Sequence, residues 1–128
     1  MTENAESLGV VYVVDDDDAV RDSLQWLLEA NRYRVFGFES AEKFLAGYDP
    51  AAIAVAILDV RMPGMSGLEL QEELIARKAT FPIIFITGHG DVPMAVNTMK
   101  KGAVDFIEKP FDQAALKALV DRLLVEAR

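Results

Sequence analysis

Short apolar runs alternate with segments of helical periodicity five times along this chain, and that alternation narrows the folds open to it. The apolar runs are β-branched or continuous, which is typical of strands covered on both faces. The segments between them repeat apolar side chains at helical spacing. Strands are expected at residues 9–14, 34–38, 53–58, 82–87 and 103–107. This order predicts an α/β fold, a doubly wound five-stranded parallel sheet with helices on both faces.

Capping residues predict where the intervening helices begin. Ser40 should cap a helix that runs to about Tyr48, without a full capping box because Lys43 stands where Glu or Gln is required. Ser66 and Glu69 complete such a box for a helix reaching residue 77. Another helix is expected over 18–31. A further helix should begin at an Asp91 cap and run to about 101, where Gly102 ends it. The last helix should carry an apolar stripe of Leu116, Leu119, Val120, Leu123 and Leu124.

Length and composition indicate one compact domain. The 128 residues suit a single folded domain at 9–126, preceded by a flexible leader at 1–8. The absence of cysteine excludes a disulfide scaffold and a thiolate metal site. A net charge of −8 should repel nucleic-acid phosphates, so no direct nucleic-acid binding is expected. The N-terminus is no secretory signal, and the apolar run at 51–58 is too short to cross a bilayer, so we expect a cytoplasmic protein without a membrane segment.

Polar residues follow four of the five predicted strands. The first strand ends in Asp15 and Asp16, the third in Asp59 and the fourth in Thr87, and Lys109 stands just past the fifth. In open α/β sheets the ligand site lies at the carboxyl ends of the strands. The sequence therefore predicts carboxylates, a hydroxyl and an ammonium group on one rim.

Three carboxylates on one rim repel each other, and a hard divalent cation relieves that repulsion. Mg²⁺ takes oxygen ligands and keeps several waters, so one or two carboxylates and a backbone carbonyl suffice. Asp16 and Asp59 are the expected direct ligands, with Asp15 acting through water, and Mn²⁺ is an expected substitute. An Asp nucleophile can accept a phosphoryl group covalently, with Thr87 and Lys109 contacting its oxygens.

Four motifs resemble the receiver domain of bacterial two-component response regulators, over about residues 9 to 125. They fall at 13–16 (VVDD), 58–67 (LDVRMPGMSG), 86–90 (ITGHG) and 102–111 (GAVDFIEKPF). The segments at 87–93 and 102–111 look like the FixJ-type branch, whose members carry a DNA-binding helix-turn-helix domain after the receiver. The resemblance implies a flavodoxin-like strand order of 2-1-3-4-5.

The resemblance also implies a role for each site residue. Asp59 would accept phosphate from a phosphohistidine on a sensor histidine kinase, beside an acidic pocket of Asp15 and Asp16. The backbone carbonyl of Arg61 would be a further Mg²⁺ ligand, and Lys109 would contact the phosphate and precede a cis proline. Thr87 and Phe106 would form a switch pair that alters the 91–107 face, through which a phosphorylated homodimer would form. On this interpretation the chain is a signalling module, not an enzyme: it catalyses only its own phosphoryl transfer and slow autodephosphorylation.

Other functions remain open at this point. A stand-alone receiver would lack the DNA-binding domain. A small Mg²⁺-dependent phosphohydrolase would share the Asp nucleophile, but such enzymes usually carry an acid two residues later, where this chain has Arg61. A flavin-binding module would need a hydroxyl- and glycine-rich loop where residues 15–18 are four aspartates. A degenerate receiver acting by contact alone is disfavoured by Asp59, Thr87 and Lys109. His89 is expected to be a loop residue near the site.

Overall fold

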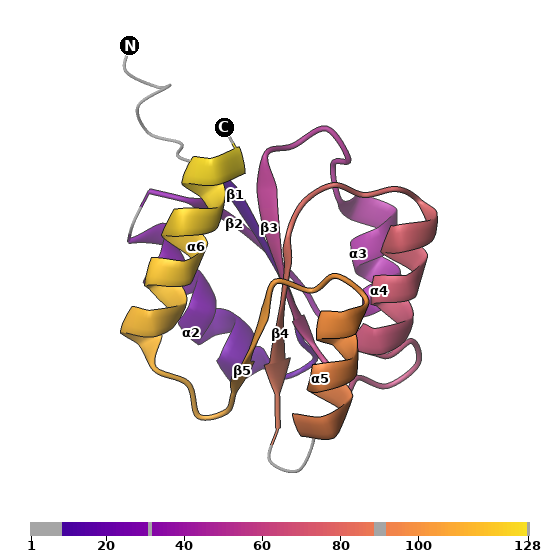
Figure 1. The fold of residues 1–128 in the computed structure, drawn as a ribbon. Coiled ribbons are helices and arrows are strands. Elements are labelled where there is room, and N and C mark those ends of the chain that lie inside the picture. The colour runs from indigo at the N-terminus through magenta and orange to yellow at the C-terminus, as the bar shows by residue number, and fades with distance from the viewer. Residues whose placement is uncertain (1–8, 31, 89–91, 128) are drawn as a thin grey trace.

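The fold is one parallel sheet with helices on both faces, as the alternation of segments predicted. A computed structural model describes residues 9–30, 32–88 and 92–127. All strand pairs in the sheet are parallel, and the strand order is β2-β1-β3-β4-β5 (Figure 1). The strands are β1 (Val10–Val14), β2 (Arg34–Phe38), β3 (Ala54–Asp59), β4 (Ile83–Thr87) and β5 (Asp105–Glu108).

Helices cover the two faces of the sheet unequally. They are α2 (Asp18–Glu29), α3 (Ala41–Gly47), α4 (Gly67–Ala76), α5 (Val92–Lys100) and α6 (Gln113–Ala127). Figure 1 shows α2 and α6 on one side of the sheet and α3, α4 and α5 on the other. Two apolar cores result. Leu24 and Leu116 belong to the first core and Phe44 and Leu70 to the second, and all four are fully buried. No helix within the described ranges is long and apolar enough to span a membrane.

The predicted caps account for where several helices begin and end. Ser40 caps α3 without a capping box, and Ser66 and Glu69 form the complete box at the start of α4. Asp17 caps α2 by accepting the backbone N–H groups of Ala19 and Val20. Gly102 follows α5 with φ +107, a conformation that glycine adopts readily. The Asp91 cap and the His89 turn lie outside the described residues.

Four of the five strands differ from their predicted bounds by one or two residues, and β3 and β5 differ at both ends. Apolar character suggested a fifth strand at 103–107, but β5 runs from 105 to 108. The N–H of Ala103 donates to the carbonyl of Thr98 at the end of α5, so the first apolar residue belongs to the helix terminus. β3 begins at 54 and extends through Asp59, which pairs with Ile86 of β4.

The register of the sheet brings the carboxyl ends of four strands to one edge. Val14 of β1 lies beside Leu58 of β3, and Thr87 of β4 lies beside Glu108 of β5. The N–H of Lys109 then donates to the carbonyl of Thr87 at 2.8 Å. The Lys109–Pro110 peptide bond is cis, as the resemblance implied. The residues singled out from the sequence therefore converge on one rim.

Candidate metal and phosphoryl site

Three aspartates from two strands form one acidic cluster. Asp15 and Asp16 follow β1, and Asp59 is the last residue of β3. One carboxylate oxygen from each lies within 4.8 Å of the others. Asp15 and Asp59 are buried, whereas Asp16 is exposed and opens the cluster to solvent. These are hard oxygen donors with an open side, which fits Mg²⁺ with several retained waters.

Lys109 supplies positive charge to the two buried carboxylates. Its Nζ atom lies 3.2 Å from Oδ2 of Asp15 and 3.8 Å from Oδ2 of Asp59. The lysine side chain is partly buried, so these ion pairs are less screened by water than surface pairs. One ammonium group cannot balance three carboxylates. The site therefore keeps an excess of negative charge.

Burial raises the pKa of Asp59 to about 7, well above its ordinary value of 3.8. The neighbouring charge of Asp15 contributes to this rise, and Asp16 has a smaller effect in the same direction. Lys109 and the backbone N–H of Arg61 oppose the shift. The ionised form of Asp59 is thus disfavoured in the metal-free protein, and a bound cation would reduce the repulsion between the carboxylates.

Thr87 is the last residue of β4, and the residue before it, Ile86, pairs with Asp59 of β3. Thr87 is fully buried, and its Oγ1 has no hydrogen-bond partner within the described part of the chain. Buried hydroxyls are usually hydrogen-bonded, so this one is available for an acceptor that enters the site. Phe106 lies on the adjacent strand β5, half-buried, and packs against the core beneath α3, α4 and α5. The predicted switch residues are therefore on neighbouring strands.

The loop after Asp59 is held by contacts at both of its ends. The N–H of Arg61 donates to Oδ1 of Asp59 at 3.4 Å. The guanidinium of Arg61 reaches Sδ of Met94 on α5 at 3.4 Å. At the far end of the loop, a Cβ on Gly67 would lie 2.0 Å from the carbonyl oxygen of Asp59. Only glycine lets α4 start this close to the site.

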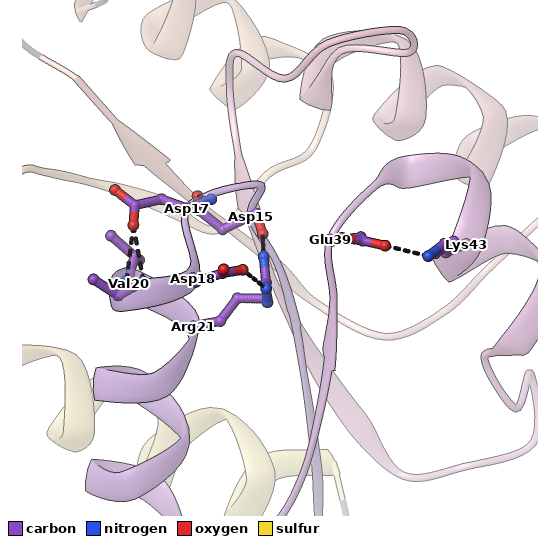
Figure 2. Close-up of polar contacts among 8 residues, drawn as sticks. Asp15, Asp17, Asp18, Val20, Arg21, Glu39 and Lys43 are labelled. Carbon is purple, nitrogen blue, oxygen red and sulfur yellow. Dashed lines mark hydrogen bonds and ion pairs between the residues drawn. The ribbon is translucent and has the colours of Figure 1, made fainter.

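Two further residues hold the loops from outside, and sequence reasoning missed both. Glu42 of α3 accepts the N–H of Met65 at 3.0 Å, and this hydrogen bond lowers the pKa of the Glu42 carboxyl. Arg21 of α2 donates from Nη1 to the carbonyl oxygen of Asp15 at 2.5 Å (Figure 2). Both side chains bind backbone atoms, and Glu42 and Met65 are also 23 residues apart in the sequence. No periodicity or motif in the sequence signals them.

Comparison with known proteins identifies the family. The sequence matches the response regulator receiver domain over residues 11–121, which is most of the chain. This chain belongs to the receiver domain family. Transcriptional regulatory protein FixJ of Azorhizobium caulinodans is 56% identical over 110 residues, covering 86% of this receiver domain and 52% of FixJ. FixJ of Bradyrhizobium diazoefficiens is 45% identical over 119 residues, covering 93% of this receiver domain and 58% of that FixJ. The receiver domain thus spans a little over half the length of these relatives.

Solved structures agree with this assignment. The crystal structure of FixJ-N superposes with a TM-score of 0.83 at 47% identity, covering 91% of this receiver domain and 94% of that chain. Response regulator StyR superposes with a TM-score of 0.86 at 46% identity, covering 92% of this chain and 60% of that one. The flavodoxin-like strand order and the FixJ-type resemblance predicted from the sequence are confirmed. The chain is a receiver domain of two-component signalling.

Proposed function

We propose that this receiver domain accepts a phosphoryl group on Asp59 from a phosphohistidine of a sensor histidine kinase. The observation that supports it most directly is Lys109, whose Nζ lies between the carboxylates of Asp15 and Asp59. A phosphoryl group on Asp59 would bring its negative oxygens to this ammonium. The buried hydroxyl of Thr87 would donate to another of those oxygens.

Mg²⁺ fits the donor set of the site. Asp16 and Asp59 would be direct carboxylate ligands, the backbone carbonyl of Arg61 a third ligand, and Asp15 a ligand through water, with Mn²⁺ able to substitute. When bound, the cation would neutralise phosphoryl oxygens and fix the geometry of transfer. The chain's own contribution is to hold oxygens of Asp15, Asp16 and Asp59 within 4.8 Å of one another before the metal arrives.

The proposed transfer step is a displacement at phosphorus. A carboxylate oxygen of Asp59 forms the new P–O bond while the P–N bond to the kinase imidazole breaks. The electron pair of that bond stays on the departing nitrogen, and the imidazole ring retains its other N–H proton. Asp59 must be ionised to attack, and Lys109 favours that form by lowering the pKa that burial raises. No general base is required.

Phosphorylation would switch the 91–107 face. Thr87 would move toward the phosphoryl group and Phe106 would follow, which would alter α5 and β5. Val96 and Met99 of α5 are exposed apolar residues on this face, and they support its use as a homodimer interface. Phosphorylation of the receiver domain would then cause it to form a homodimer.

The receiver domain would act as part of a longer protein. Its folded unit is proposed as 9–126, preceded by a leader at 1–8. Its FixJ relatives are transcriptional regulatory proteins, and the matched region covers only 58% and 52% of their length. We therefore propose a cytoplasmic transcription regulator whose DNA-binding domain lies outside this sequence. With a net charge of −8, the receiver itself would not bind DNA.

Phosphorylation by a small donor tests the proposal. The protein is incubated with acetyl phosphate or phosphoramidate and Mg²⁺, and its intact mass is measured. We expect a gain of one phosphoryl group in the wild type and in Asp22→Asn, which neutralises an exposed carboxylate of α2. Asp59→Asn should show none, and chelation of Mg²⁺ should abolish the gain. An equal gain in Asp59→Asn would overturn the proposal, and steady turnover of p-nitrophenyl phosphate would favour a phosphohydrolase instead.

A further inference from the structure

Arg21 of α2 makes one hydrogen bond to the acidic loop and one within its own helix. Nη1 donates to the carbonyl oxygen of Asp15 at 2.5 Å, and Nη2 contacts Oδ1 of Asp18 (Figure 2). The two acceptors differ in surroundings, because Asp15 is buried whereas the side chain of Asp18 is 82% exposed; the side chain of Arg21 itself is only 16% exposed. The arginine stem also lies against β2, since a Cβ on Gly37 would be 3.5 Å from Cδ of Arg21. Arg21 is therefore fixed by packing as well as by charge.

We infer that Arg21 is a positioning residue that sets the geometry of the metal site through the peptide between Asp15 and Asp16. This inference rests on the proposed Mg²⁺ function of the cluster. The carbonyl that Arg21 holds lies in the same rigid plane as the nitrogen and Cα of Asp16. Orienting that plane fixes the direction in which Asp16, the exposed member of the cluster, projects its carboxylate.

Three other hydrogen bonds hold the same turn, and one of them spans the peptide that Arg21 contacts. The N–H of Asp15 donates to the carbonyl of Phe38, and the N–H of Asp17 donates to Oδ1 of Asp15 at 2.8 Å. Asp17 in turn accepts the N–H of Ala19 at 2.9 Å, so it belongs to the helix cap. Arg21 is the side chain that contacts the Asp15 carbonyl. Its removal should free that peptide and loosen the hydrogen bond from the Asp17 N–H to Asp15, while leaving β1 and the helix cap in place.

The charge of Arg21 and its positioning role have opposite effects on the affinity for Mg²⁺. A guanidinium near the cluster repels a divalent cation, so its loss through Arg21→Met would tighten Mg²⁺ binding if charge alone mattered. If Arg21 positions the ligands, the same substitution weakens binding. Arg21→Lys keeps the charge but loses the planar fork that reaches both acceptors. The sign of the change in Mg²⁺ affinity therefore separates the two roles.

The experiment measures Mg²⁺ affinity by calorimetry and amide hydrogen exchange without metal. We expect the Kd for Mg²⁺ to rise about tenfold in Arg21→Met and less in Arg21→Lys, as for other residues that orient metal ligands. Asp18→Asn, which removes only the exposed contact, and Arg77→Met, which removes a distant ion pair with Glu73, should stay within about twofold of wild type. In the metal-free protein, the amide of Asp17 should exchange faster in Arg21→Met than in Arg77→Met.

The outcomes distinguish this inference from the proposed function. Tighter or unchanged Mg²⁺ binding in Arg21→Met, with wild-type binding intact, would overturn the inference alone. Unchanged exchange at Asp17 would overturn it as well, whether or not metal binds. A wild-type protein without Mg²⁺ affinity would refute the proposed function, and the positioning of a metal ligand with it. Thermal unfolding of each variant checks that the fold persists.

Discussion

Neutralising Asp59 should stabilise the metal-free protein, and the gain should grow as the pH rises. The pKa of Asp59 is about 7 in the folded protein, against an ordinary value of 3.8. Between these values the folded chain holds a proton that the unfolded chain has released. The free energy of unfolding contributed by Asp59 therefore falls as the pH rises from about 4 to about 7, and is level above that. Asp59→Asn removes this loss because the amide cannot ionise.

The magnitude follows from the size of the shift. A difference of about three pKa units corresponds to about 4 kcal/mol. The rim beside Asp16 is open to water, and screening there reduces the effect to about 2 kcal/mol. About 1 kcal/mol of this change falls between about pH 5 and about pH 8. The stabilisation of Asp59→Asn relative to wild type should increase by that amount over this range.

Urea unfolding in the presence of a chelator measures this difference at each pH. Circular dichroism is the better probe, because Trp26 is 75% exposed and its fluorescence should change little on unfolding. Asp22→Asn serves as the control, since it neutralises an exposed carboxylate and should give a difference that does not vary with pH. A constant difference for Asp59→Asn, or one that shrinks as the pH rises, would refute the reasoning from burial and like charge.

Two more predictions concern the metal and the approach of α4. Above pH 7, Mg²⁺ at about ten times its Kd should raise the free energy of unfolding by about 1.4 kcal/mol. Thermal melts should show that Asp16→Asn loses most of this gain; an equal gain in that variant would contradict its role as a ligand. Gly67→Ala should lower the free energy of unfolding in urea by about 3 kcal/mol, because its Cβ would lie 2.0 Å from the Asp59 carbonyl oxygen. Gly37→Ala, whose Cβ would make only an ordinary contact, should change stability by less than about 1 kcal/mol, and equal losses would contradict the steric argument.

The sequence was sufficient to predict the fold because each of its signals is local. Continuous apolar runs predicted five strands, and β2 was placed at its observed limits, 34–38. At two of the strand starts that differ from the prediction, apolar character was misleading. Ala103 is apolar and suits a strand, but its N–H completes the end of α5. Ile53 was expected to open the third strand, yet it lies before β3 and is 50% exposed.

The acidic cluster was also predictable, since charged residues at the ends of buried parallel strands must meet at one edge. The pattern located Asp15, Asp16 and Asp59 together with Lys109. The structure places carboxylate oxygens of the three aspartates within 4.8 Å of one another, and the Lys109 ammonium within 3.8 Å of two of them. It could not locate the supports of the cluster. Arg21 donates to a backbone carbonyl, which leaves no trace in residue type.

The two loops of the site are held by residues of opposite charge, and this asymmetry has an electrostatic reason. The loop after β1 carries two aspartates toward the cluster, and its support is the cation Arg21, which offsets part of their repulsion. In the loop after β3, the backbone N–H of Met65 is the group that is held. Its support is the anion Glu42, whose carboxylate can only accept a hydrogen bond. Glu42 adds negative charge to the chain but binds at the far end of its loop from Asp59. Each support therefore matches the backbone group that it holds: the cation donates to a carbonyl oxygen, and the anion accepts from an N–H group.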